Sequence, residues 1–360
     1  MSQTNHHSTS STDAPGVTVV CLNYKGKTVL PDCLESLRRQ TYPNLHVIVV
    51  ENASGDGSAQ IVRERFPEVE LIENAENLGF GGGNNVGLAA VRTPFAVMLN
   101  NDTELDPECI AEMVRVMQSD PTVGAVASKI LLKFNDLRID AAGIEICPDG
   151  LALGRGRWHP KEDYADEAEV FFVSDCCGMY RMAMIESIRL KGFGRQGWEI
   201  YDEDFFAYAD ETDLGWRAQL AGWSSRYAPR AVCYHCHSAS TGSVHPRKVY
   251  WVERNRIWVG VKSFPLWLLA WGGCYMVARY AWQAWGVFSG KGRAGEFRKE
   301  YSAVRLALVL VKAWLGALWG LPRMCRKRWA IARTRRIGAS QIRGLLRRFG
   351  IPAKSVALRN

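Results

Sequence analysis

The stretch VMLNNDTELDP, residues 97–107, combines a strand pattern with a polar end. Its apolar part is typical of a buried strand, and it stops on three short oxygen-bearing side chains, Asn100, Asn101 and Asp102. Asn100 and Asp102 would supply two hard oxygen ligands from one side of the chain, as a divalent cation requires. An Asx-turn that merely closes the strand is the alternative interpretation, and these residues alone leave it open.

Segments of two kinds alternate around this stretch. Short β-branched runs are followed by segments whose apolar residues recur every three or four positions, which is the pattern of βαβ units. We therefore predict an α/β fold with a sheet that is largely parallel at this end and has right-handed crossovers. The predicted strands are 17–22, 46–51, 69–72 and 95–99, and the predicted helices lie near 29–40, 57–66, 83–91 and 107–118.

Polar side chains follow several of the predicted strands. Asn23 follows the first strand, residues 51–54 end the second, and residues 100–102 end a later one. Ligands of such sheets bind at the carboxyl ends of the strands, so we expect these side chains to share one crevice. The segment NLGFGGGNNVGL, 77–88, predicts a tight glycine loop that lets a sugar or a phosphate approach the backbone closely.

An acidic cluster marks the second half of the predicted sheet. The periodic Leu214, Arg217 and Leu220 before Gly222 predict a helix over about 210–221 with a glycine cap. Three carboxylates lie in its first turn, and either one of them is a general base or all three simply favour a helix N-terminus. They are Asp210, Glu211 and Asp213.

Composition limits the class of protein. The chain has 360 residues, 47% of them hydrophobic, which is enough for one large domain with an appendage. Residues 1–16 lack an apolar run and are expected to be a disordered leader, not a signal peptide. Ten scattered cysteines fit a reducing compartment without disulfides. A zinc site in CYHCH, 233–237, is a weaker alternative because no second pair lies at the required spacing.

Charge divides the chain into two parts with different partners. Residues 291–360 hold 18 Lys and Arg against two Glu, a net charge of +16, whereas residues 1–290 carry −8. The segment 264–288 is rich in Trp and has about 15 uninterrupted apolar residues, fewer than the roughly 20 that span a bilayer. It could span with tilt or lie in the interface. Basic residues then recur every seven positions, as in an in-plane helix on an anionic membrane, which we favour over nucleic acid as the partner. They are Lys291, Arg298, Arg305 and Lys312.

Several segments resemble the inverting glycosyltransferases of family 2, which have the GT-A fold. The resemblance runs in order over about 250 residues, and its last segments and the basic tail are similar to the rhamnosyltransferase and galactofuranosyltransferase branch that acts on lipid-linked glycans. The segments that carry it are VCLNYKG (20–26), VENASGDGS (50–58), NLGFGGGNNVG (77–87), LNNDTELDP (99–107), CGMYRMAMIESI (177–188), ADETDLGWRAQLAGW (209–223), YHCHSASTGS (234–243) and ERNRIWVGVKSFP (253–265).

The resemblance implies a role for each matching position. Glu51 stands where the family usually has an Asp that reads the nucleotide base. Asn100, Asp102 and His235 match the family's metal ligands, here for Mg²⁺ or Mn²⁺, and Glu211 matches the base, with Asp210 and Asp213 as alternatives. The donor-binding positions would be Asn23, Glu51, Asn52, Asn77, Gly79, Phe80, Gly81, Asn84 and Asn101.

These implications define an expected protein. Residues 17–262 would form a GT-A domain, a Rossmann-like mixed sheet flanked by helices, and residues 263–360 a membrane-associated helical region. The enzyme would move a sugar, with L-rhamnose from dTDP-rhamnose as first choice, to a lipid-linked glycan or polysaccharide acceptor in cell-envelope synthesis. It would work at the cytoplasmic face of the cell membrane. The alternatives are another donor (UDP-galactofuranose or UDP-GlcNAc), a nucleotidyltransferase, or a non-catalytic scaffold that binds glycolipids.

Overall fold

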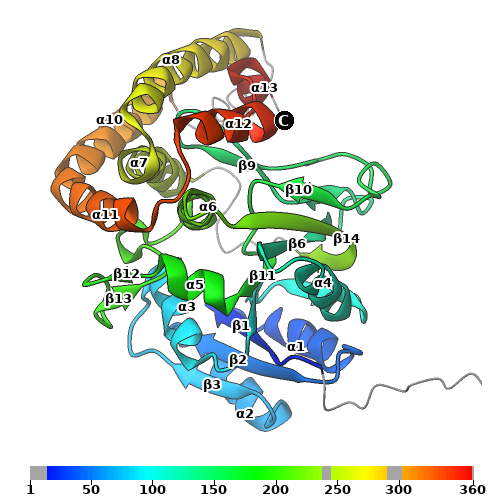
Figure 1. The fold of residues 1–360 in the computed structure, drawn as a ribbon. Helices are drawn as coiled ribbons and strands as arrows, with labels where there is room; N and C mark the ends of the chain where they lie inside the picture. Colours follow the sequence, from blue (N-terminus) through cyan, green and yellow to red (C-terminus); the bar gives the residue numbers. More distant parts are fainter. Residues whose placement is uncertain (1–13, 237–244, 290–301, 359–360) are drawn as a thin grey trace, which may run out of the picture.

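The computed structural model describes residues 14–236, 245–289 and 302–358, so most of the predicted leader lies outside it (Figure 1). Its first part is the predicted alternation of strands and helices, which is confirmed. The elements are β1 (Val17–Asn23), α1 (Leu30–Arg38), β2 (Leu45–Glu51), α2 (Ser58–Arg65), β3 (Glu70–Glu73), α3 (Gly79–Ala90), β4 (Phe95–Asn100), β5 (Thr103–Leu105) and α4 (Cys109–Gln118).

One mixed sheet forms the centre of the molecule, in the order β10-β14-β6-β11-β4-β1-β2-β3. The strands β3, β2, β1 and β4 are mutually parallel, as predicted for this end. The antiparallel β11 separates β4 from β6, which makes the sheet mixed. Helices pack on both faces of the sheet. The strands of its parallel part are therefore buried on both sides.

The second part of the chain completes this sheet and carries the acidic helix. The predicted helix over 210–221 is confirmed as α6 (Asp210–Leu220), with Gly222 at φ +87° after it. The other elements are β6 (Val123–Leu132), β7 (Ile139–Ala141), β8 (Ile144–Ile146), β9 (Ala152–Gly154), β10 (Ala168–Val170), β11 (Cys177–Arg181), α5 (Met182–Ile188), β12 (Leu190–Lys191), β13 (Trp198–Glu199), η1 (Glu203–Phe205) and β14 (Ser224–His235).

The glycine-rich segment differs from its prediction as a loop over 77–88. Helix α3 already begins at Gly79, whose φ is +73°. The reason is tertiary: a side chain at Gly79 would meet the Phe206 carbonyl at 2.4 Å, and one at Gly81 would meet Tyr201, the Asp202 carbonyl and Asp210 at 3.1–3.2 Å. These glycines therefore let α3 approach the segment 201–210, and that contact fixes the helical start.

Helices beyond residue 245 gather at the end of the molecule opposite α2 (Figure 1). Their inner faces belong to the same hydrophobic core as the sheet, since Trp258, Phe264, Leu268 and Met324 pack in one cluster with Val20. The hydrophobic core thus continues across the domain boundary that we predicted at 262/263. The helices are α7 (Pro246–Ser263), α8 (Leu266–Ser289), α10 (Ala303–Trp319), α11 (Leu321–Thr334), α12 (Ala339–Phe349) and α13 (Ala353–Leu358).

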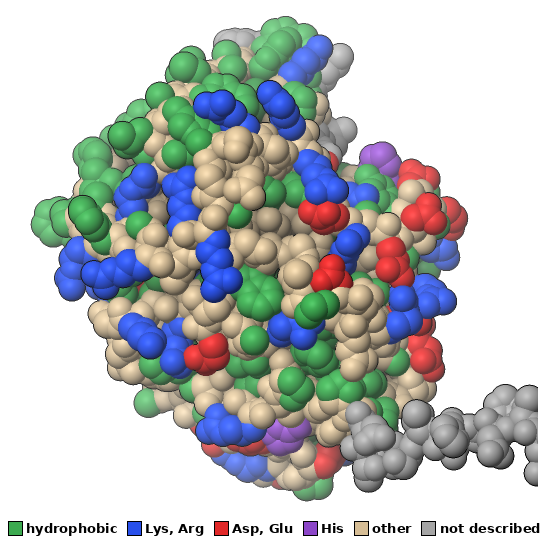
Figure 2. Space-filling model, viewed as in Figure 1, with side chains coloured by type: hydrophobic (Ala, Val, Ile, Leu, Met, Phe, Trp, Pro, Cys, Tyr) green, Lys and Arg blue, Asp and Glu red, His purple; other side chains and the backbone are tan. Residues whose placement is uncertain are grey.

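The outer faces of these helices expose large apolar side chains. Figure 2 shows hydrophobic side chains along the edge made by α8 and α10, with Lys and Arg beside them. On α10 they are Val304, Leu308, Val311, Trp314, Leu315, Leu318 and Trp319. Within the described residues no single helix is long and apolar enough to cross a bilayer, and α10 with α11 meets that criterion only as a pair bent by 57°. Of the predicted basic repeat, Arg305 and Lys312 are exposed on α10, while Lys291 and Arg298 lie outside the described residues.

Candidate active site

Three predicted donor-binding residues meet at the carboxyl ends of β1, β2 and β4. Asn23 pairs in register with Glu51 across β1 and β2, and its amide donates to the Glu51 carboxylate and, at 2.8 Å, to Ser58 Oγ. Asn101 donates to Asn23 Oδ1 at 2.7 Å. The expected meeting of these side chains at one sheet edge is therefore confirmed, and that they line a ligand crevice stays a prediction.

Glu51 is held from several directions at once. Its carboxylate accepts from the Ser54 N–H at 2.8 Å and from Ser58 Oγ at 2.9 Å, besides Asn23, and the residue is only 5% exposed. This rigid carboxylate ends β2 at the edge where a nucleotide would lie. Its contact with a base stays a prediction.

Asn52 and Asn77 shape the approach to α3. Asn52 donates to Asn77 Oδ1 at 3.0 Å and to the Gly79 carbonyl at 3.1 Å, and it accepts from the Leu78 N–H at 3.0 Å. Asn77 Oδ1 also accepts from the Gly79 N–H at 2.9 Å. These amides hold the loop before α3, and their direct contact with a donor stays a prediction.

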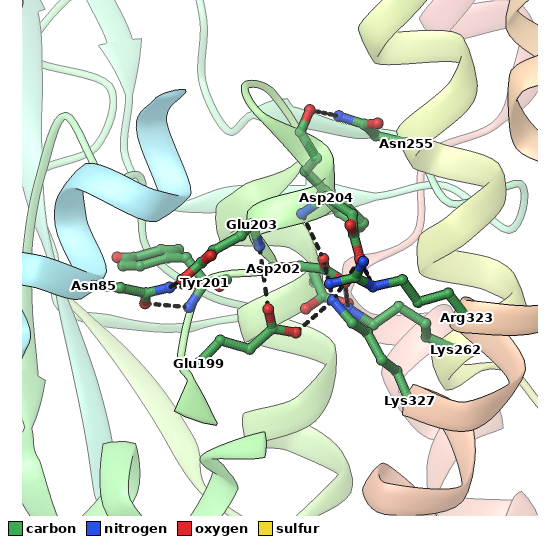
Figure 3. A network of polar contacts seen from close by, with 12 residues as sticks. Asn85, Glu199, Tyr201, Asp202, Glu203, Asp204, Asn255, Lys262, Arg323 and Lys327 are labelled. Atoms are coloured by element: carbon green, nitrogen blue, oxygen red, sulfur yellow. Dashed lines mark hydrogen bonds and ion pairs between the residues drawn. The ribbon is translucent and has the colours of Figure 1, made fainter. Parts of the chain in front are cut away.

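Two further predicted donor positions lie on α3. Phe80 packs edge-on against Tyr201, with ring centroids 5.9 Å apart. Asn84 is buried, and its neighbour Asn85, which the sequence did not single out, makes the visible polar link. Asn85 donates to the Tyr201 carbonyl at 2.9 Å and accepts from the N–H groups of Ile200 and Tyr201 (Figure 3). Helix α3 is thereby fastened to the segment that leads to α6.

Asp102 and His235, two predicted metal ligands, are brought together by strand pairing. The short β5 pairs with the end of β14, where His235 lies opposite Thr103, and the Cys236 N–H donates to the Asp102 carbonyl at 2.9 Å. As a result His235 Nε2 lies 3.4 Å from Asp102 Oδ1. Asn100, the third predicted ligand, ends β4 two residues before Asp102.

Asp140 on β7 is a site residue that the sequence did not reveal. It lies 2.8 Å from His235 Nδ1, and Arg157 holds its other carboxylate oxygen at 2.8 Å. Burial lowers the pKa of His235, but the neighbouring Cys176 and the carboxylates of Asp102 and Asp140 outweigh burial and raise it. A histidine whose Nδ1 is oriented by a carboxylate presents Nε2 as a ligand, which is the arrangement typical of metal-binding histidines.

These residues fit a divalent cation bound together with a diphosphate. Within the described residues no group of three or more His, Cys, Asp and Glu side chains is placed to hold a metal by itself. Asp102, His235 and the Asn100 amide would leave coordination positions for phosphate oxygens and water, as Mg²⁺ and Mn²⁺ sites do. In the described part of the chain no such cluster supports the alternative of a zinc site over 233–237, and His237 lies outside the described part.

The three carboxylates of α6 differ sharply in environment. Asp213 is fully buried between two cations, with Arg217 Nε at 3.0 Å and Lys262 Nζ at 2.7 Å. A carboxylate held in this way is a structural ion-pair partner. Asp210 is buried as well, and within the described residues its Oδ1 has no hydrogen-bond partner. Glu211 is half-buried beside it.

Asp175, just before β11, completes this acidic cluster. It accepts from the hydroxyls of Tyr180 and Tyr201, the latter at 2.9 Å. Burial, and then the Glu211 carboxylate, raise the pKa of Asp175 to about 7. Burial likewise raises the pKa values of Glu211 and Asp210. The cluster therefore retains protons to unusually high pH, a property of groups that accept and release protons near neutrality.

Figure 3 shows a buried ion network, which Lys262 joins to α6 through its contact with Asp213. Lys262 of α7 and Lys327 of α11 are both fully buried and share Asp202 as partner. Lys327 also lies 2.5 Å from Glu199 and 2.9 Å from Asp204. The sequence grouped Lys327 with a basic, membrane-facing tail, and the structure corrects this because its ammonium group points into the protein. The C-terminal helices thus supply cations that the 199–213 segment requires.

The family model described as "Glycosyl transferase family 2" matches residues 17–189, which contain Glu51 and Asp102. These residues are a family 2 glycosyltransferase domain. The family match ends before α6 and His235. The roles considered for α6 and His235 therefore rest on the geometry described above. The non-catalytic scaffold and the nucleotidyltransferase alternatives are not supported.

The curated relatives of this glycosyltransferase include two proteins that are themselves named as sugar transferases. The N-acetylglucosaminyl-diphospho-decaprenol L-rhamnosyltransferase of Mycobacterium tuberculosis is 26% identical over 246 residues, which cover 62% of this chain and 77% of the relative. The putative glycosyltransferase EpsH of Bacillus subtilis is 27% identical over 248 residues, 66% of each chain.

Solved structures show that the glycosyltransferase has the GT-A fold. TarS residues 1–349 of S. aureus in complex with UDP-GlcNAc has a TM-score of 0.54 at 14% identity, covering 91% of this chain and 92% of that one. GalNAc-T7 with UDP, GalNAc and Mn²⁺ has a TM-score of 0.57 at 12% identity, covering 75% of this chain and 51% of that one. The predicted fold class is confirmed, and at these identities the likeness concerns the fold alone.

Proposed function

We propose that this enzyme transfers L-rhamnose from dTDP-rhamnose, with inversion and dependence on a divalent cation, to a lipid-linked glycan acceptor. One observation carries the proposal. The Asn100 N–H donates to the Cys176 carbonyl at 3.0 Å, so the candidate cation ligands at the end of β4 lie beside Asp175 and the acidic cluster. The residues proposed to bind the cation and diphosphate therefore lie next to the residues proposed to supply the general base.

The chain's own residues can perform each half of the transfer. Asp102, His235 and Asn100 would hold the cation, which when bound neutralises the negative charge that develops on the diphosphate. Glu211 would accept the proton of the acceptor hydroxyl while that oxygen bonds to the anomeric carbon and the bond to the diphosphate breaks. The products are the glycoside and the nucleoside diphosphate, with the proton on Glu211.

The choice of donor and acceptor rests on similarity. The Mycobacterium tuberculosis relative is named as an L-rhamnosyltransferase that acts on a decaprenol diphosphate glycan. UDP-GlcNAc and UDP-galactofuranose are the competing donors, and UDP-GlcNAc is the ligand of the similar TarS structure. A polysaccharide without a lipid is the competing acceptor.

We place the enzyme at the cytoplasmic face of the cell membrane, held there by its C-terminal helices. The exposed apolar side chains of α10 and the basic residues beside them support this location. An apolar face next to cations is what an anionic leaflet binds.

A donor panel tests the proposal. Purified full-length protein is incubated with dTDP-rhamnose, UDP-GlcNAc or UDP-galactofuranose and a GlcNAc-diphosphate-lipid, with Mn²⁺ or with EDTA, and the nucleoside diphosphate and the glycolipid product are quantified. We expect product from dTDP-rhamnose only, abolished by EDTA. Product from another donor would replace the assigned sugar, and full activity in EDTA would remove the cation.

A further inference from the structure

Three aromatic side chains pack against one another next to α6, a cluster that we call the aromatic shelf: Phe206, Tyr208 and Trp251. The rings of Phe206 and Trp251 stack with centroids 5.3 Å apart and 27° between their planes, and Tyr208 lies 6.2 Å from Trp251. Phe206 is 38% exposed, although large aromatic side chains are usually buried where they serve only packing. Two of the rings come from the loop before α6 and one from α7.

The loop that carries the shelf is held in a costly backbone conformation. Phe206, Tyr208 and Ala209 all have positive φ, between 65° and 69°, although none is glycine. Such residues are strained and persist only where surrounding contacts impose the conformation, most often at functional sites. In this conformation Phe206 and Tyr208 lie against Trp251.

Helix α7 imposes this conformation through two adjacent side chains. The Asn255 amide donates to the carbonyls of Phe205, Ala207 and Tyr208 at 3.1, 2.9 and 2.8 Å (Figure 3 shows one of these contacts). Arg254 donates to the carbonyls of Asp204 and Phe205 at 3.0 and 2.8 Å. The segment ERNRIW, which is part of the resemblance described above, thus contains the residues that hold the loop before α6.

The shelf lies between the two halves of the candidate site. The Phe206 carbonyl accepts from the Phe80 N–H at 2.6 Å, and Phe80 is a predicted donor position. Ala209 directly precedes Asp210 and Glu211, the carboxylates that can accept a proton. A molecule resting on the shelf would therefore lie near both the donor segment and the base.

We propose that the aromatic shelf binds the acceptor sugar, whose apolar C–H face packs on Phe206, supported from its other side by Trp251, while a hydroxyl faces Glu211. The proposal rests on the proposed function and specifies where its acceptor binds. A pyranose ring has one apolar face and a polar rim, and the shelf has the matching character, since the Lys248 ammonium group lies 5.4 Å from the Tyr208 ring. A hydrocarbon chain would not require a cation at the rim.

Direct binding separates the sugar from the lipid as the group recognised. The probes are two water-soluble short-chain alkyl diphosphates, one bearing GlcNAc and one without a sugar, titrated into full-length protein by calorimetry. We expect Trp251→Leu to weaken binding of the GlcNAc probe by about tenfold and to leave the sugar-free probe unchanged, while Trp251→Phe stays within about threefold of the parent. Trp329→Leu, a change of a 74% exposed residue on α11, is the matched control and should alter neither affinity.

Two results would overturn the proposal that the shelf binds the acceptor sugar. One is equal affinity of parent and Trp251→Leu for the GlcNAc probe, with an unchanged thermal midpoint as proof of folding. The other is an equal loss for both probes, which would assign the shelf to the diphosphate or the chain. Because these titrations need no nucleotide sugar, they test the shelf even if the donor panel fails. In the transfer reaction, Trp251→Leu should raise the acceptor KM by about tenfold and the donor KM by much less.

Discussion

Lys262 Nζ lies 2.7 Å from Asp213 Oδ1 in the interior of the protein, where both side chains are inaccessible to solvent. Because Arg217 contacts the same carboxylate, Asp213 is balanced by two cations and is fixed as part of the fold. Of the three acids that open α6, this relationship removes one from the candidates for the base. Glu211 is half-buried at the helix start, whereas Asp210 is almost inaccessible.

Substitution of these acids should separate catalysis from stability. Glu211→Gln keeps size and hydrogen bonding but cannot accept a proton, so kcat should fall about 10²- to 10⁴-fold with a near-parental Tm. Asp213→Asn should instead lower the free energy of unfolding by about 3 kcal/mol, since it leaves Lys262 and Arg217 undercompensated. Transfer kinetics and thermal unfolding are measured together. If Asp213→Asn kept its Tm and lost transfer, the base would be Asp213.

The pH dependence of transfer should depend on Asp175. Its pKa is raised to about 7 by burial and by Glu211, and burial also raises the pKa of Glu211. A base must be ionised to act, so kcat should rise with pH through an acid limb. Asp175→Asn removes a neighbouring negative charge, lowers the pKa of Glu211, and should shift this limb by about one pH unit to lower pH. Tyr180→Phe removes a hydrogen bond to the ionised form of Asp175, which raises the pKa of Asp175 and keeps that group neutral to higher pH, so it should shift the limb in the same direction by a smaller amount. An unchanged limb in Asp175→Asn would mean that the two groups are not coupled.

The fold was largely predictable because its signals are local. Each strand from β1 to β4 carries its own short apolar run, and polar residues at the strand ends identified the sheet edge where Asn23, Glu51 and Asn101 meet. The start of α3 was not predictable, since glycines favour loops and only contact with Phe206 fixes the helix there. Asp140 and Asp175 were missed for a related reason. Each is a single carboxylate without a motif, and strand pairing alone brings it to His235 or Glu211.

Lys327 shows the same limit in the tail, and its role is testable. Burial opposes its charge, but Asp202, Glu199 and Asp204 raise its pKa, so the ammonium form is retained in the interior. Lys327→Met should leave these acids unbalanced and lower the free energy of unfolding by about 3–5 kcal/mol, as measured by denaturant unfolding. Arg333→Met changes an exposed cation on the same helix and should stay within about 0.5 kcal/mol of the parent. Equal small effects of both changes would mean that α11 is only a surface appendage.

Membrane binding should depend on the exposed face of α10. Leu315→Asp places a charge on a side chain that is 60% exposed, and it should weaken binding to anionic phospholipid vesicles in co-sedimentation while the Tm is unchanged. High salt should release the parent only in part, because salt screens the basic residues and not the apolar contact. Phe134→Asp, at a 79% exposed residue far along the chain from these helices, is the control and should bind like the parent. Parental binding by Leu315→Asp would show that α10 is not the membrane-facing element.

Cation binding should depend on Asp140 even though it is not a proposed ligand. Its contact with His235 Nδ1 directs Nε2 toward Asp102, so Asp140→Asn should raise the Mn²⁺ concentration for half-maximal transfer about 10- to 100-fold. His235→Ala should do so at least as strongly, and Asp102→Ala should abolish donor turnover. Calorimetric titration of Mn²⁺ in the presence of dTDP gives a second readout that does not need catalysis. Asp163→Asn is the matched control, because Asp163 also contacts a histidine nitrogen, His159 Nδ1 at 3.1 Å, but on the exposed surface. Parental Mn²⁺ affinity in both Asp140→Asn and His235→Ala would assign this histidine to the fold and remove it from the cation site.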